Sequence, residues 1–170
     1  MKKVFLVLSI VLATTALKAQ DGATGPELSI GLDGGIPTGD FKQIAKFGIG
    51  GTVKFAYNFN ENVAATLTSG YISFGGKDLG EGIKWPATGT IPVKAGLRYT
   101  FPGGFYGEPQ FGFTSMNNGG GTGFTYAANL GYRTSPGIDI SARYEGISKS
   151  GSTLSFIGLR IAYAFPFGSN

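Results

Sequence analysis

The side chains of this 170-residue sequence that could do chemistry are its carboxylates and its basic groups, because the chain contains neither Cys nor His. Without thiol or imidazole groups, the usual nucleophilic and acid–base mechanisms and most transition-metal sites are excluded. Carboxylates such as Glu108 and Asp139 could still work as a catalytic pair, but an Arg faces each of them in the pairing derived next. We therefore predict ion pairs rather than an active site: no enzymatic activity, no catalytic residue, no metal and no cofactor.

The stretch LRYTFPGGFYGEP, residues 97–109, predicts the first ion pair. Aromatic or aliphatic residues occupy every second position of its two arms, and Pro-Gly-Gly at 102–104 separates the arms. A three-residue hairpin loop at these positions places Arg98 directly opposite Glu108. A two-residue loop would place Arg98 opposite a proline of the apolar face, so we expect the three-residue loop.

A second turn, Ser-Pro-Gly at 135–137, independently gives the same arrangement, because a three-residue loop there places Arg133 opposite Asp139. All four Arg of the chain fall on this minority face of the alternating segments. The predicted ion-pair network on that face consists of Asp33, Lys54, Lys94, Arg98, Glu108, Arg133, Asp139, Arg143, Glu145 and Arg160.

The elements that must position these residues are β-strands. From about residue 27 onward, apolar residues alternate with polar or small residues, in segments separated by Gly, Pro, Asn and Ser. We predict eight strands, at 27–35, 48–58, 63–74, 90–101, 105–115, 124–134, 138–147 and 154–166. Short turns follow the second, fourth and sixth strands, and longer stretches follow the first, third, fifth and seventh. This pattern predicts an all-β, eight-stranded, antiparallel up-and-down barrel with short turns at one end and longer loops at the other.

The composition decides which face of the barrel points outward. Only 14% of the residues are charged, whereas a soluble domain carries about 25%. The polar face is rich in Gly, Ala, Thr and Asn, which suits a narrow interior better than a water-facing exterior. Aromatic residues gather near the short turns, as in the interfacial girdle of a membrane barrel: Tyr57, Phe59, Tyr99, Phe101, Phe105, Tyr132, Tyr163, Phe165 and Phe167. We therefore predict a transmembrane barrel whose apolar face contacts lipid and whose charged face lines the lumen.

The N-terminus predicts export. Lys2 and Lys3 precede the apolar run 4–13, and small and polar residues follow as far as Gln20, which is typical of a secretory signal peptide. We predict a signal peptide at 1–20 and one barrel domain at 21–170. Without the three lysines of the leader, basic and acidic residues nearly balance, so nucleic acid is not an expected partner.

The alternating pattern, the segment GIPTGDF and the final strand SFIGLRIAYAFPF resemble the small eight-stranded outer-membrane β-barrel proteins of Gram-negative bacteria, of the OmpA/OmpX type in the porin family. The resemblance covers about residues 27–167. It implies an integral protein of the cell outer membrane with short periplasmic turns and longer extracellular loops. It also implies contact with outer-membrane lipid and lipopolysaccharide, and with the barrel-assembly machinery during biogenesis.

Two functions remain open. The first is a structural or loop-mediated interaction role, in which the ion-pair network plugs the lumen, since an eight-stranded barrel is only wide enough for its own side chains. The alternative is a narrow channel that weakly prefers anions, because six basic and four acidic residues were assigned to the lumen.

The long loop between the third and fourth strands offers a possible contact site for a protein partner, formed by Lys77, Asp78, Lys84 and Trp85. Trp85 is the only Trp of the chain and could be a contact hot spot, or it could mark the outer membrane interface. Phe41 and Phe47, predicted in the first loop, allow the same two interpretations.

Overall fold

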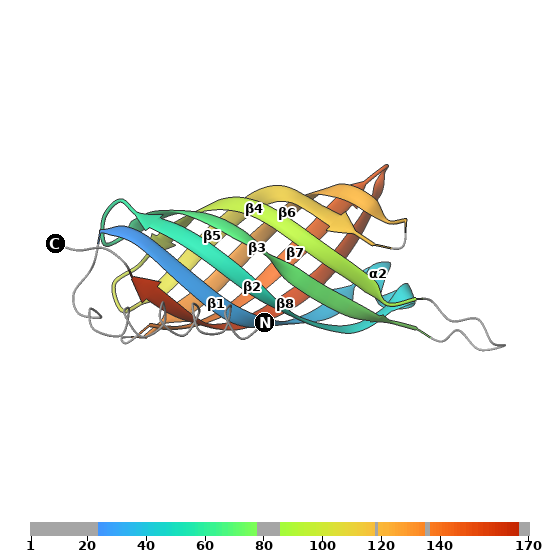
Figure 1. Cartoon of the computed structure of the whole chain (residues 1–170), viewed down its shortest axis with the longest axis horizontal. Coiled ribbons are helices and arrows are strands. Elements are labelled where there is room, and N and C mark those ends of the chain that lie inside the picture. The colour runs from blue at the N-terminus through green and yellow to red at the C-terminus, as the bar shows by residue number, and fades with distance from the viewer. Residues whose placement is uncertain (1–23, 78–85, 118, 135–136, 167–170) are drawn as a thin grey trace, which may run out of the picture.

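The computed structural model describes residues 24–77, 86–117, 119–134 and 137–166, which form a closed β-barrel (Figure 1). Consecutive strands pair antiparallel around the barrel, and β1 closes it by pairing with both β2 and β8. The elements are β1 (Gly25–Thr38), α2 (Phe41–Ile44), β2 (Ala45–Asn58), β3 (Val63–Gly76), β4 (Thr88–Thr100), β5 (Phe105–Met116), β6 (Gly121–Arg133), β7 (Ile138–Lys149) and β8 (Ser152–Pro166). The predicted eight-stranded up-and-down topology is confirmed.

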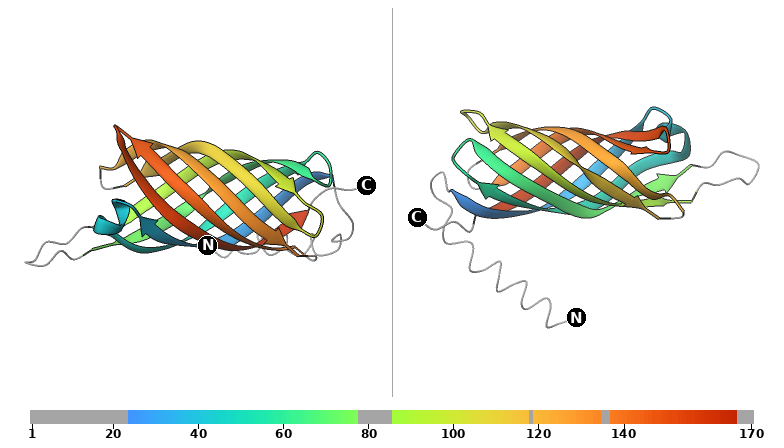
Figure 2. Two further views of the ribbon diagram at one scale, coloured as in Figure 1. Left: turned by 180° about the vertical axis from the view of Figure 1, so that it is seen from behind. Right: turned by 90° about the horizontal axis from the view of Figure 1, so that it is seen from above.

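The two ends of the barrel differ in their connections. We call the end with the connections 59–62, 101–104 and 134–137 the turn end, and the opposite end the loop end. Strand β1 begins and β8 ends at the turn end, whereas α2 lies at the loop end (Figures 1 and 2). Within the part of the chain that the structure describes, no helix is long and apolar enough to span a membrane.

The predicted strand register is confirmed at both hairpins of the turn end. Strands β4 and β5 pair Thr100 with Tyr106 and Gly96 with Gln110, which is the register of a three-residue loop. The Phe101 amide donates a hydrogen bond of 2.7 Å to the Phe105 carbonyl, and both glycines of the loop have positive φ, of 91° and 88°. Strands β6 and β7 pair Arg133 with Asp139, as predicted.

At the loop end, the predicted lengths of two connections between strands are wrong. The stretches after the fifth and seventh strands were expected to be long loops, but the connections are only 117–120 and 150–151. The connection from β3 to β4 spans 77–87 and is shorter than predicted, because β3 continues to Gly76 and β4 already begins at Thr88. At this end the strands extend one to three residues beyond their predicted ends, because backbone pairing continues there, as between Ala45 and Gly76 and between Lys149 and Ser152.

Large apolar side chains cover the outside of the barrel. Leu32, Leu130 and Ile161 are 62–72% exposed, and the turn-end aromatics that the structure describes also point outward. Rings pair along this girdle, with centroids 5.0 Å apart for Tyr99 and Phe101. Phe167 lies outside the described residues. An exterior of this composition is stable in lipid rather than in water.

Glycines on the inner face make room for large side chains from neighbouring strands. A Cβ atom added at Gly131 would lie 2.3 Å from the Tyr106 ring, and one added at Gly48 would lie 2.5 Å from the Phe74 ring. Both rings are buried, at 2% and 0% exposure. Aromatic rings can therefore cross the interior of a barrel this narrow.

Candidate functional site in the barrel lumen

The charged interior begins at the turn end with Glu27, which is not among the residues predicted in the lumen. Arg133 binds the Glu27 carboxylate with two hydrogen bonds of 2.5 and 2.9 Å. Arg98 contacts the same carboxylate at 3.3 Å and donates a hydrogen bond of 2.9 Å to the side-chain oxygen of Asn58. Glu27 has the same parity in β1 as Asp33, and this was the signal that could have placed it on the inner face.

Glu108 is the centre of the next contacts. Its carboxylate accepts hydrogen bonds of 2.8 Å from the Lys54 ammonium and from the Thr66 hydroxyl. The Gln110 amide also donates to it, at 2.5 Å. Glu108 and Lys54 are 1% and 3% exposed. Lys54 belongs to β2 and Glu108 to β5, so this ion pair spans the lumen.

The predicted ion pair between Arg98 and Glu108 is therefore wrong, although the register that suggested it is right. Arg98 contacts Glu27 across the barrel, and Glu108 contacts Lys54. Long side chains in a narrow lumen can reach strands that are distant in sequence, so the residue opposite in the ladder is only one of several possible partners.

Asp139, the second residue of β7, lies among three polar groups toward the turn end. The Tyr106 hydroxyl donates a hydrogen bond of 2.6 Å to one of its oxygens. The other oxygen lies 3.5 Å from Arg133 and 3.7 Å from Arg160, without a hydrogen bond to either. The predicted contact of Arg133 with Asp139 is present, but Glu27 is the closer partner of Arg133.

Asp33 holds two guanidinium groups from other strands. Arg143 donates a hydrogen bond to one Asp33 oxygen, and Arg160 lies 3.9 Å from the other. Thr52 also donates to this carboxylate, at 2.6 Å. Because Asp33 is only 1% exposed, these contacts replace the water that would otherwise solvate the carboxylate.

Glu145 completes the network toward the loop end. Its carboxylate accepts hydrogen bonds of 2.5 Å from Lys94 and 2.9 Å from Arg143. Lys94 and Glu145 are 2% and 1% exposed. Every charged residue predicted in the lumen is thus paired there with a group of opposite charge.

The inner charges nearly balance. Among the described residues, the lumen contains six basic side chains and, with Glu27, five acidic ones rather than the four expected from the sequence. The excess of positive charge is therefore smaller than predicted. Among the described residues, no group of acidic side chains is arranged to hold a metal ion.

Above the charged layers, apolar side chains close the lumen at the loop end. The cluster comprises Phe41, Ala45, Ile72, Phe74, Met116, Ile147 and Phe156, with Ile44 and Leu154 against it. The guanidinium of Arg143 lies 5.5 Å from the Phe156 ring centroid, where the charged and apolar layers meet. This apolar layer is not among the features predicted from the sequence.

The predicted loop contacts are only partly described. Lys77 follows β3, and its amide donates a hydrogen bond of 3.1 Å to the Ile44 carbonyl of α2. Asp78, Lys84 and Trp85 lie outside the described residues. The two phenylalanines predicted in the first loop lie in different environments. Phe41 is buried inside the barrel, with 1% exposure, whereas Phe47 belongs to β2 and is 59% exposed.

A closed eight-stranded barrel with an apolar exterior and a charged, filled interior is the architecture of a small transmembrane β-barrel. Residues 5–165 match the outer membrane protein beta-barrel domain family, and the chain belongs to this family of outer-membrane proteins.

Solved structures show the same fold. Ail, the attachment invasion locus protein of Yersinia pestis, is 18% identical with a TM-score of 0.59, and the match covers 84% of this chain and 99% of Ail. The N-terminal barrel domain of Pseudomonas aeruginosa OprF is 16% identical with a TM-score of 0.59, with coverage of 84% and 99%. Neisserial surface protein A is 15% identical with a TM-score of 0.59, with coverage of 86% and 100%. No curated protein matches the sequence significantly.

Proposed function

We propose that this protein is a plugged outer-membrane barrel without enzymatic activity, which stabilises the envelope or presents its loop end to a partner. The observation that carries the proposal is the filled lumen, in which charged layers and an apolar layer follow one another along the barrel. An interior of paired charges and packed rings supports the barrel but leaves little space for a solute.

The loop end is the expected contact surface. We propose that it faces outward after signal-peptide-directed export, with lipid and lipopolysaccharide around the barrel. Lys42, Lys46 and Lys149 are exposed there, and phosphate or sulfate groups would complement these lysines. The structure of Ail in complex with the heparin analogue sucrose octasulfate provides a precedent for an anionic ligand on a barrel of this fold.

Planar bilayer recording tests the plug. We expect no resolved conductance steps from the wild-type protein at neutral pH, whereas an open porin recorded in the same bilayers shows them. Reproducible steps that depend on the amount of wild-type protein would contradict the plug and favour the alternative, a narrow channel. One observation favours that alternative: Asp139, Arg133 and Arg160 each have a buried polar atom without a hydrogen-bond partner among the described residues, so protein contacts do not satisfy every polar group of the lumen.

Cysteine labelling of intact cells tests the orientation. The chain has no native Cys, so a single introduced thiol reports on one position. We expect Lys42→Cys, at the exposed loop end, to react with a membrane-impermeant maleimide, and Glu61→Cys, at the exposed turn end, to react only after the cells are lysed. Labelling of Glu61→Cys alone in intact cells would reverse the topology and exclude the loop end as a surface contact site.

A further inference from the structure

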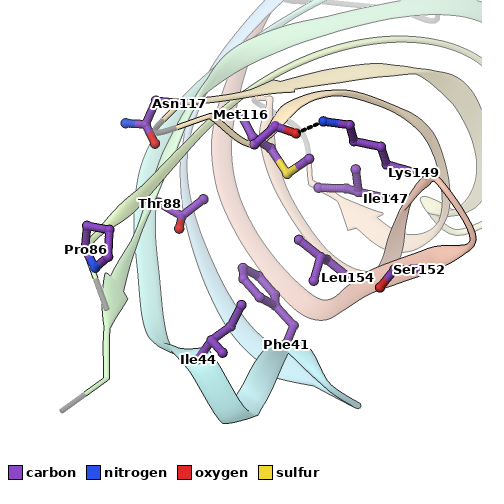
Figure 3. Close-up of a pocket in the computed structure, with 11 residues that line it drawn as sticks. Phe41, Ile44, Pro86, Thr88, Met116, Asn117, Ile147, Lys149, Ser152 and Leu154 are labelled. Carbon is purple, nitrogen blue, oxygen red and sulfur yellow. Dashed lines mark hydrogen bonds between the residues drawn. The ribbon is translucent and has the colours of Figure 1, made fainter. Parts of the chain in front are cut away.

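A pocket of about 280 Å³ opens at the loop end, where side chains of the apolar layer form its walls (Figure 3). Phe41, Met116 and Ile147 line it together with Ile44 and Leu154. These side chains come from α2, β5, β7 and β8, so the pocket exists only in the closed barrel. Its walls are mainly apolar, which is typical of sites that bind the apolar part of a small ligand.

The pocket has a closed floor. Phe41 packs edge-on against Phe74 with ring centroids 4.9 Å apart, and Phe74 packs against Phe156 at 5.1 Å. Phe74 and Phe156 are 0% and 1% exposed and do not line the pocket, and Phe156 also lies against the Arg143 guanidinium of the ion-pair network. A molecule that enters from the loop end therefore reaches a dead end rather than a path through the membrane.

One cation lies at the edge of this apolar space. Lys149 ends β7, is exposed, and its ammonium donates a hydrogen bond to the Gly120 carbonyl, which also lines the pocket. Within the described part of the chain, no carboxylate pairs with Lys149, whereas the lysines of the lumen, Lys54 and Lys94, are each bound to a glutamate. The neutral polar groups of Thr88, Asn117 and Ser152 form the rest of the rim.

We propose that this pocket binds a free single-chain anionic amphiphile, a medium-chain carboxylate, from the medium outside the cell. The alkyl chain would lie against Phe41, Met116 and Leu154, where its burial provides the main driving force. The carboxylate would remain at the rim beside Lys149, where a charge-assisted hydrogen bond is available. Access from the medium rests on the outward orientation of the loop end proposed above, whereas binding to the purified protein does not depend on that orientation.

Methyl NMR of the protein in lipid nanodiscs, with decanoate as the probe, tests the proposal. We expect saturable shifts of the Met116, Ile147 and Leu154 methyl groups. The Leu130 and Ile161 methyl groups face lipid, with 72% and 62% exposure, and report on decanoate that only enters the bilayer. Shortening the probe to octanoate should weaken binding by about fourfold for each methylene removed.

The charge contribution is tested separately. Lys149→Gln should weaken decanoate binding by up to about fivefold, the upper end of the range for an exposed ion pair, and leave binding of uncharged decanol unchanged. Lys46→Gln removes another exposed loop-end cation that does not line the pocket, and should leave both affinities unchanged. Heat-modifiable gel mobility confirms that each variant is folded.

Two results would overturn the proposal. Equal, non-saturating shifts of the pocket methyl groups and of Leu130 and Ile161 would show that decanoate only partitions into lipid. Saturable binding that Lys149→Gln does not weaken would show that the pocket does not select an anion. Neither result bears on the bilayer recording, so the plugged-barrel function would stand or fall independently.

Discussion

Replacing either Lys54 or Glu108 by Ala should destabilise the barrel by about 3–5 kcal/mol, because each change leaves the other charge buried without its partner. The ammonium and the carboxylate are 2.8 Å apart, and both side chains are at most 3% exposed. The double variant leaves neither charge stranded, so its loss should be smaller than the sum of the two single losses. Urea unfolding from lipid vesicles measures the free energy of unfolding of the two single variants and of the double variant.

The matched control is the same set of two single variants and one double variant, a double-mutant cycle, made on Arg98 and Glu108. These residues share the hairpin register, but no ion pair joins them, since Arg98 contacts Glu27 and Asn58. We expect the coupling in this cycle to be less than half of that between Lys54 and Glu108. If Arg98 were the more strongly coupled partner, the cross-lumen arrangement would be wrong and the pairing expected from the hairpin alone would be right.

Asp33→Ala should lower stability by a comparable amount and should also make the charge of the lumen more positive. The variant loses the carboxylate that Arg143 contacts directly and Arg160 at 3.9 Å, leaving two buried guanidinium groups less well compensated. We expect a loss of about 3–5 kcal/mol in the free energy of unfolding. In planar bilayers, the added positive charge should also favour anions in any current that the variant passes.

The control is Asp40→Ala, which makes the same substitution at an exposed loop-end position whose side chain does not cap α2. Its unfolding free energy should change by no more than about 0.5 kcal/mol. Removing the stranded charge as well, in Asp33→Ala with Arg143→Met, should recover part of the lost stability. A loss for Asp33→Ala no greater than that for Asp40→Ala would show that water, rather than the ion pairs, solvates the interior.

The faces and the register of the strands follow from the amino-acid sequence alone. Because side chains alternate between the two faces of a strand, Arg98 and Glu108 lie on the opposite face from their apolar neighbours, independently of the rest of the chain. The Pro-Gly-Gly turn then fixes which residues of β4 and β5 lie opposite each other, because loop length sets hairpin register. Both are local properties, and at the turn end the predicted strands begin and end within two residues of the observed positions.

Which charges meet inside the barrel, by contrast, depends on how the whole chain folds. Glu27 binds arginines from β4 and β6, and Lys54 of β2 reaches Glu108 of β5, because closure of the barrel brings these strands within reach of one another across the lumen. The apolar layer around Phe74 has the same origin, since its members come from α2 and from strands on all sides. Period and turn length describe neighbouring strands, whereas contacts across the lumen depend on the tilt and stagger of all eight strands together.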